Sequence, residues 1–181
     1  MMIDELRDEH DLEDSVDRDA ARWLAELPGV DAGIEMIHMR VKRLGQETTR
    51  MLAGIAQHHG LSVGDWETLS VLRRSGAPYV MTPSELVQAL GVTSGTISVR
   101  IERLIQAGLL EPANGGDDGR SRPIRLTDEG ARRWQAATAE RTALEERIFS
   151  RALNPEEIPY LNLLLGALLV EMEAEQNGGR N

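Results

Sequence analysis

The chain contains no cysteine, which excludes disulfides, thiolate metal sites and redox sensing by its own thiols. Aromatic residues are also scarce, with one phenylalanine, two tyrosines and three tryptophans among 181 residues. Leucine, isoleucine, valine, alanine and methionine must therefore fill the core of one ordinary domain with an extension. No apolar run approaches the roughly 20 residues that a membrane-spanning helix requires.

The N-terminus lacks the basic flank and the apolar stretch of a secretory signal peptide, so we expect a cytoplasmic protein. It is acidic instead: residues 1–19 hold nine acids against two arginines, a balance of −7 within the total of −10. Such a segment cannot bury enough apolar surface to fold alone. We therefore expect residues 1–15 to form a disordered acidic tail.

Two short helices joined by a tight turn are predicted at residues 82–91 and 93–107. Thr82 and Glu85 can form a capping box on the first helix, and Gly91 can end it in a left-handed conformation. Apolar residues three or four apart give the second helix one buried stripe. This order is that of a helix-turn-helix, whose second helix can enter the major groove of DNA.

The other side of the second helix carries side chains suited to DNA recognition. Small hydroxyl groups allow close approach to base edges, and arginines reach guanines or phosphates. The predicted DNA-contacting residues of this helix are Ser94, Gly95, Thr96, Ser98, Arg100 and Arg103.

A β-hairpin is predicted directly after this helix. Residues 109–113 form an extended run, residues 114–119 are rich in turn formers, and residues 124–126 alternate as a half-buried strand does. Arg120 and Arg122 at its tip can reach a narrow minor groove or phosphates. An isolated turn of this kind is more often an ordinary solvated hairpin, but its place after a helix-turn-helix favours a DNA-binding wing.

These segments together resemble the multiple antibiotic resistance regulator (MarR-type) family. The resembling segments are Leu90–Ser98, Ile101–Leu104, Ala107–Leu110, Asp118–Ser121, Ile124–Thr127 and Gly130. The resemblance is specific over residues 82–130 and architectural over residues 31–176. It implies a mainly α winged helix-turn-helix with dimerisation helices at both ends, and a dimeric, ligand-responsive transcription factor, usually a repressor. It also implies that Asp118 braces Arg120 in the wing.

Within this family, the chain looks closest to the subgroup that responds to urate, aconitate and similar anionic metabolites. The similarity lies in an additional N-terminal helix with Trp23 and in the run Leu72–Tyr79. It implies a ligand sensor at Trp23, Glu67 and Arg100. Glu67 replaces the usual Asp, and a further sensor arginine is missing because its position falls near Pro112. The alternative is that Trp23 only packs the extra helix and that Glu67 and Arg100 form a structural ion pair.

The net charge of −10 opposes phosphate binding, which needs positive charge. Residues 91–133 nevertheless hold seven arginines against six acids, a balance of +1. Binding must then depend on where those arginines point, and non-specific affinity for DNA should be modest.

Apolar periodicity predicts further helices on both sides of this region. They are expected at residues 16–27, at 34–58, from Ser62 to Ser75, from Thr127 to Leu153, and from a capping box at Asn154–Glu157 to Met172. Residues 77–81 are expected to be a linker or a short strand that pairs with the wing. The expected domains are the tail at 1–15, an extra helix and a long dimerisation helix at 16–60, the winged helix-turn-helix at 61–130, and C-terminal dimerisation helices at 131–176.

The last helix is apolar over more than one face, which is too much for a helix lying singly on a small domain. Leu161, Leu165 and Leu168 follow a heptad-like spacing, and the long helix at 34–58 has a similar stripe. We predict that both helices bury these stripes in a two-fold homodimer; the alternative is that they pack against each other within one chain. A dimer suits DNA binding, since two recognition helices must lie about one helical turn apart on a pseudo-palindromic operator.

Patterns for catalysis, cofactors and metals are weak. His58 and His59 are adjacent, whereas two metal ligands on one helix face stand four residues apart. We expect them at a helix end, where imidazolium suits the negative end of the dipole. The glycine-rich residues 115–119 lack the flanking strand and helix of a phosphate loop, and the isolated carboxylates have no partner base or nucleophile. No enzyme activity, cofactor or metal site is predicted.

Three interpretations remain. A dimeric regulator that binds a double-stranded DNA operator and responds to a small effector, such as an anionic metabolite, is favoured. A winged-helix module that binds protein without DNA would not need Arg120 and Arg122 at a wing tip. A small all-α enzyme is supported only by isolated carboxylates.

Overall fold

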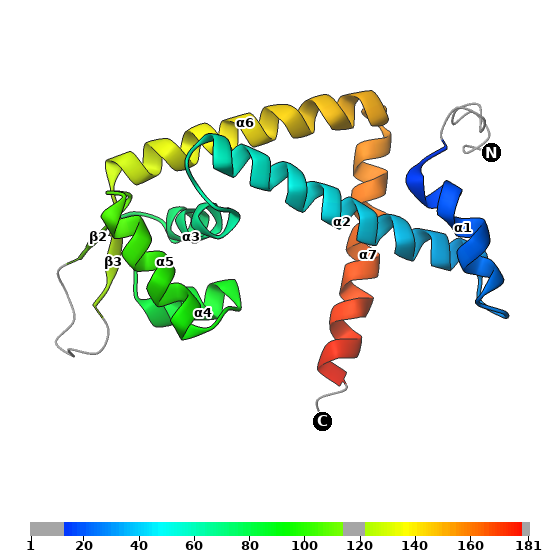
Figure 1. Ribbon diagram of the computed structural model, residues 1–181, viewed down its shortest axis with the longest axis horizontal. Coiled ribbons are helices and arrows are strands. Elements are labelled where there is room, and N and C mark those ends of the chain that lie inside the picture. Colours follow the sequence, from blue (N-terminus) through cyan, green and yellow to red (C-terminus); the bar gives the residue numbers. More distant parts are fainter. Residues whose placement is uncertain (1–12, 114–121, 179–181) are drawn as a thin grey trace. The chain divides into compact units, whose positions relative to one another are not determined.

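A computed structural model describes residues 13–113 and 122–178 of the chain. These residues form helices α1 (Ser15–Ala25), α2 (Ala32–His58), α3 (Val63–Arg74), α4 (Pro83–Leu90), α5 (Ser94–Gln106), α6 (Asp128–Ala152) and α7 (Glu157–Gly178), and strands β1 (Val80–Met81), β2 (Leu110–Pro112) and β3 (Ile124–Leu126) (Figure 1). The chain divides into two compact units, Met1–Gly54 and Ile55–Asn181. The predicted mainly α fold with a small hairpin is confirmed.

The first unit contains α1 and most of α2, which are joined by a shared ion-pair cluster. The Asp14 side chain caps α1 by accepting from the N–H groups of Val16 and Asp17. Arg40 of α2 donates to both carboxylates, with Nε 2.9 Å from Asp14 Oδ2 and a terminal nitrogen 2.5 Å from Asp17 Oδ1. The hydrogen bond from Arg40 lowers the pKa of Asp14 to about 2. The predicted helix therefore begins at Ser15, inside the expected acidic tail.

The second unit has its core where α3, α4 and α5 meet the short sheet. The largest fully buried side chains are Leu69, Leu72, Leu86, Ile97, Leu104, Leu109, Leu110 and Thr68. On α3, Leu69 and Leu72 stand three positions apart. On α5, the buried Ile97, Ile101 and Leu104 stand four and three apart, so each of these helices turns one apolar stripe inward. Helix α6 covers α3 through two indole hydrogen bonds, from Trp66 to Thr138 (3.1 Å) and from Trp134 to Ser70 (2.8 Å). These bonds fix a helical platform behind α5.

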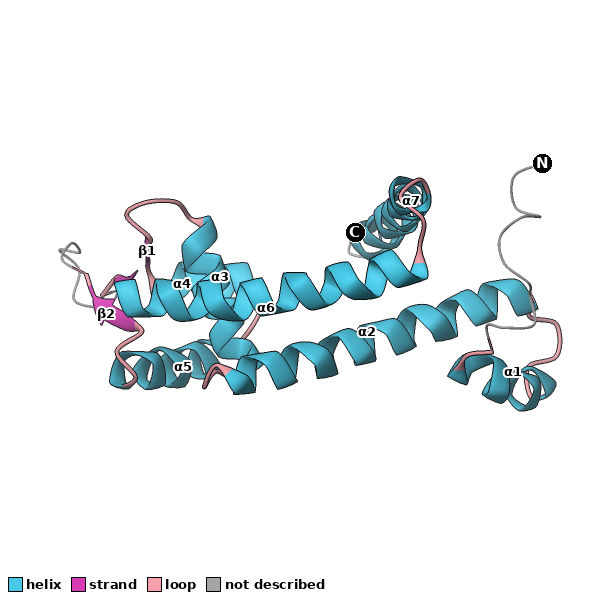
Figure 2. Cartoon of the chain, turned by 90° about the horizontal axis from the view of Figure 1, so that it is seen from above, coloured by secondary structure: helices cyan, strands magenta, loops and turns pink. Residues whose placement is uncertain are grey.

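The sheet has the strand order β1–β3–β2, and both pairings are antiparallel. Figure 2 colours the strands magenta and the helices cyan. Val80 pairs with Arg125, so the segment at 77–81 does contain the short strand that we considered. Ile124 and Leu126 are buried while Arg125 is exposed, which confirms the predicted alternation. Glu111 on β2 lies opposite Arg125 on β3 and accepts two hydrogen bonds from the guanidinium of Arg125, at 3.0 and 2.6 Å.

Local capping sets the helix boundaries close to where the sequence predicted them. Thr82 and Glu85 form the expected reciprocal capping box, and Gly91 ends α4 with φ +65°. Gly108 follows α5 with φ +70°. At α7, the Glu157 carboxylate accepts from the backbone N–H of Asn154 at 2.6 Å. Among the described helices, none is long and apolar enough to cross a membrane.

Gly130, in the first turn of α6, should tolerate no side chain. A Cβ there would overlap the backbone carbonyl oxygen of Leu109 and would lie 2.9 Å from Cδ1 of Leu126. We expect Gly130→Ala to lower the free energy of unfolding by about 1–3 kcal/mol, because a backbone atom must shift. Gly95→Ala is the matched control, since its Cβ meets nothing within 4 Å. Urea denaturation measures both variants, and equal stability of the two would contradict this packing.

Candidate nucleic-acid interface

The N-terminal half of α5 presents a polar face to solvent. Thr93 caps the helix by accepting from the N–H of Thr96 at 3.2 Å, and the two hydroxyls hydrogen-bond at 2.9 Å. On the opposite side, Ile97 and Leu104 are buried against the core. Four of the predicted DNA-contacting residues are exposed on this half: Ser94, Gly95, Thr96 and Ser98. The structure thus leaves a small, hydroxyl-rich surface at the start of the second helix of the motif.

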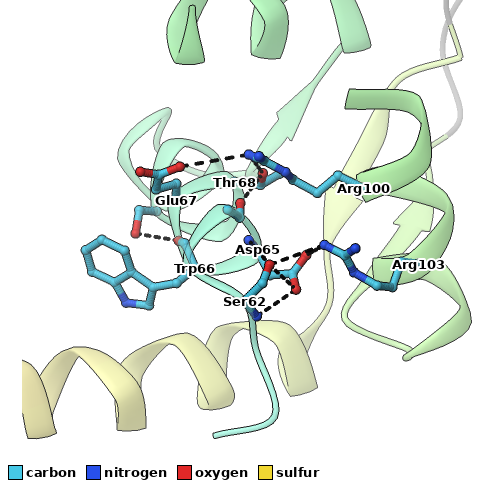
Figure 3. Close-up of polar contacts among 9 residues, drawn as sticks. Ser62, Asp65, Trp66, Glu67, Thr68, Arg100 and Arg103 are labelled. Atoms are coloured by element: carbon cyan, nitrogen blue, oxygen red, sulfur yellow. Dashed lines mark hydrogen bonds and ion pairs between the residues drawn. The ribbon is translucent and has the colours of Figure 1, made fainter. Parts of the chain in front are cut away.

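Arg103 turns away from this surface and binds a buried carboxylate on α3 (Figure 3). Its guanidinium donates to Asp65 Oδ1 at 2.5 Å and to the Ser62 hydroxyl oxygen at 3.3 Å. The other oxygen of Asp65 accepts from the backbone N–H and the hydroxyl of Ser62, at 2.8 and 2.7 Å. One carboxylate therefore caps α3 and fixes α5 at the same time. A phosphate contact by Arg103 stays a prediction.

The charge on Asp65 depends on this cation. Burial raises the pKa of the carboxyl, but hydrogen bonds from Arg103 and Ser62 outweigh burial and leave the pKa below its usual value. A buried carboxylate without a partner would cost several kcal/mol. Arg103 is thus needed to keep α3 and α5 together.

Arg100 also lies against α3 instead of extending into solvent. Its side chain is 13 % exposed, and a terminal nitrogen donates to the Thr68 hydroxyl at 3.2 Å and lies 4.0 Å from Glu67 Oε2. The guanidinium occupies the space above Gly64, where a Cβ would overlap it. The structure therefore brings Arg100 and Glu67 together, as the sensor hypothesis requires. Base contact by Arg100 stays a prediction that this position does not favour.

Trp23, the third sensor candidate, belongs to the first unit, whereas Glu67 and Arg100 belong to the second. Its side chain is partly exposed, and the indole N–H donates to Glu35 Oε1 at 2.7 Å. This bond joins α1 to the first turn of α2. A ligand contact by Trp23 stays a prediction.

The wing is described only at its base. Arg122 is exposed and Pro123 beside it is buried. The predicted brace between Asp118 and Arg120 falls on residues 114–121, outside the described residues. The brace and the DNA contacts of Arg120 and Arg122 therefore stay predictions.

Most of the described arginines between residues 91 and 133 form ion pairs with acids. Besides Arg103 with Asp65, Arg125 binds Glu111, and Arg132 and Arg133 bind Glu129. Counting charges along the sequence could not reveal these pairs, because Asp65 and Arg103 lie 38 positions apart. Attraction for phosphates must therefore be weaker than the number of arginines indicates.

A polar cluster that sequence reasoning missed joins the end of α2 to α6. Glu140 Oε2 lies 3.0 Å from His58 Nδ1 and 2.8 Å from His59 Nε2. Both hydrogen bonds lower the pKa of Glu140, and the bond with His59 has the larger effect. The adjacent histidines were visible in the sequence, but nothing linked them to an acid 81 positions beyond His59.

The second unit combines a helix-turn-helix, a hairpin and a covering helix, which defines a winged helix-turn-helix. Comparison with known proteins specifies the family. Residues 59–121 match the MarR family model. The HTH-type transcriptional regulator PecS of Dickeya dadantii is 34 % identical over 145 residues, which cover 80 % of this chain and 87 % of PecS. The chain belongs to the MarR family and is a DNA-binding transcriptional regulator.

Solved structures share this fold over most of their length. AbsC, a MarR family transcriptional regulator from Streptomyces coelicolor, matches with a TM-score of 0.62 and 25 % identity, over 82 % of this chain and 97 % of AbsC. A mutant of E. coli MarR, solved with operator DNA, matches with a TM-score of 0.62 and 21 % identity, over 76 % of this chain and 96 % of that one. The second likeness shows the fold alone.

The Asp65 carboxylate should make stability depend on pH in one direction. Its pKa in the folded chain lies below the reference value of 3.8, so the unfolded chain binds more protons as the pH falls. Its stabilisation is complete well above pH 3.8 and is lost as the pH falls through the folded-state pKa. Asp65→Asn should therefore be about 1–2 kcal/mol less stable than wild type at neutral pH. That difference should shrink in urea denaturation as the pH falls below 3.8; a constant difference would exclude this role.

Proposed function

We propose that the chain binds a pseudo-palindromic DNA operator as a homodimer and represses transcription until a small effector binds. The observation that supports this most is the exposed hydroxyl-rich face of α5 within a MarR-family winged helix-turn-helix. Small side chains there allow the helix backbone to approach base edges closely. The first helix of the motif, α4, supports α5 from behind through buried Leu86.

Two groups of residues divide the work of binding in this proposal. Ser94, Gly95, Thr96 and Ser98 contact base edges and the phosphates next to them. Arg122 and Arg120 of the wing contact phosphates or the minor groove. Since acids hold most other described arginines of this region, the wing supplies most of the attraction for the DNA backbone.

The apolar surface of α7 supports the homodimer. No residue of this helix is buried, and Leu163, Val170 and Met172 are each more than 60 % exposed. The first unit carries a similar stripe on α2, where Ile34 and Leu44 are 69 % and 66 % exposed. Apolar surface of this extent marks an interface. A second copy is the partner that we propose, because a two-fold operator requires two recognition helices.

The contact between Arg100 and α3 offers a route for the effector. An anionic ligand near Glu67 would compete for Arg100, which lies 4.0 Å from the Glu67 carboxylate. Because Arg100 belongs to α5, drawing it toward the ligand would shift the helix that reads DNA. Such a ligand regulates binding only if it prefers the released state.

A winged-helix module that binds protein without DNA was the alternative from the sequence. Membership of the MarR family of DNA-binding regulators argues against it, although the acid-paired arginines around α5 leave few described cations for phosphates. We assign the chain no catalytic activity and place it in the cytoplasm, where it can reach an operator.

A negative charge on the reading face should abolish operator binding. Ser98→Glu places a carboxylate on the exposed half of α5 that faces DNA, where it would repel phosphates and clash with base acceptors. Gln106→Glu adds the same charge at the exposed C-terminal end of the same helix and should bind almost normally. Mobility shifts with DNA that flanks the chain's own gene compare the two. Equal affinities would remove this face of α5 from the mechanism.

A charge in α7 should disrupt the dimer. Leu165→Asp would bury an unpaired carboxylate between two copies of the helix, which costs several kcal/mol unless the interface opens. We expect a folded monomer by sedimentation, with α-helical circular dichroism retained. Asn162→Asp adds the same charge to an exposed polar position of α7 and should remain a dimer. If Leu165→Asp also sediments as a dimer, α7 does not form the interface.

A further inference from the structure

Three side chains that can bind metal meet in the second unit, where the end of α2 lies against α6. His58 is the last residue of α2, His59 follows it, and Glu140 lies on α6. Their nearest nitrogen and oxygen atoms all lie within 4.8 Å of one another. Both imidazoles point at one carboxylate oxygen, at 3.0 and 2.8 Å. Two separate elements thus bring three donors to one point.

The backbone holds the two adjacent histidines in place. Gly60 has φ +66°, its N–H donates to the carbonyl of Gln57 at 3.0 Å, and the N–H of Leu61 donates to that of Ala56 at 2.8 Å. These two bonds form a Schellman motif, which ends a helix in a fixed geometry. His59 is the first residue after α2, and its ring reaches the same carboxylate oxygen as the ring of His58. Neighbours within a regular helix would diverge by about 100°.

The donors suit a late first-row divalent ion. Imidazole nitrogens bind zinc, copper, nickel and iron, and a carboxylate with water commonly completes a zinc site. Bonds of about 2.0–2.2 Å place tetrahedral donors roughly 3.3 Å apart. The observed distances of 2.8 and 3.0 Å are slightly shorter. The exposed His58 and Glu140 side chains move apart by a few tenths of an ångström, and the ligand nitrogens of His58 and His59, which lie within 4.8 Å of each other, take up the same spacing.

We propose that His58, His59 and Glu140 bind a divalent transition-metal ion such as zinc, with water in the remaining positions. The side chains of His58 and Glu140 are exposed, so an ion and its water ligands can enter from solvent. The bound ion would replace hydrogen bonds with coordinate bonds and would fasten the end of α2 to α6.

This fastening would act on the platform behind α5. Ser62, the N-cap of α3, stands three residues after His59, and α3 packs on α6 through the hydrogen bond from Trp66 to Thr138. The first turn of α3 holds α5 through the ion pair between Asp65 and Arg103. Metal binding would therefore stabilise the arrangement that presents α5. An effect on operator affinity rests on the proposed function, whereas metal binding itself does not.

A cobalt titration tests the site directly. Untagged full-length protein, first stripped with a chelator, should bind one Co²⁺ per chain with a visible d–d absorption band, and Zn²⁺ should abolish that band. His59→Gln and Glu140→Gln should each weaken Co²⁺ binding at least about tenfold, because each removes a ligand. His38→Gln, which removes a histidine of the first unit, is the matched control and should bind like wild type. Circular dichroism checks that each variant keeps its helices.

The outcomes separate metal binding from regulation. Absence of a saturable band in wild type, or an equal loss in His38→Gln, would overturn the proposed site. Since the cobalt measurement needs no DNA, it stands even if the chain binds no operator. Operator titrations with and without Zn²⁺ then test the coupling, which predicts a change in affinity that Glu140→Gln abolishes. Zinc binding with unchanged operator affinity would overturn the coupling.

Discussion

The buried carboxylate of Asp65 is the interaction on which the DNA-binding unit depends. One of its oxygens accepts a hydrogen bond from the backbone N–H of Ser62 at the start of α3. The other accepts from the guanidinium of Arg103 on α5 at 2.5 Å. Without the cation the carboxylate would be a buried, unpaired charge, so α3 and α5 must stay together. The α3 platform is fixed in turn to α6 by the indole bonds of Trp66 and Trp134. The orientation of the reading face follows from these contacts.

This arrangement uses arginine for structure more than for DNA binding. Arg103 and Arg100 leave α5 on the side of α3, and Arg125 binds across the hairpin to Glu111. What remains exposed on the N-terminal half of α5 is small and mostly uncharged. A regulator of this kind gains little from phosphate attraction alone and must depend on close contact with bases and on its wing. The acidic composition of the whole chain is consistent with weak attraction for phosphates.

Local signals in the sequence predicted most of the fold. Thr82 with Glu85, Gly91 and Gly108 fix helix ends within a few residues of chain, so their patterns can be recognised without the structure. The pairs that join distant segments could not be predicted in this way. Glu140 beside the two histidines and Asp65 beside Arg103 follow from how helices pack, which spacing alone does not encode. For Arg100 the sequence predicted the partner Glu67 but not that Gly64 makes room for the guanidinium.

Selection of bound sequences from a pool of random duplex DNA tests the central claim most directly. If two copies of α5 read one operator, the enriched sequences should contain two inverted half-sites whose centres lie about 10–10.5 base pairs apart or a multiple of that. Enrichment of that pattern by wild type, and none by a variant charged on the reading face, is the predicted result. Enrichment of a single half-site, or of no sequence at all, would contradict a dimeric operator-binding regulator.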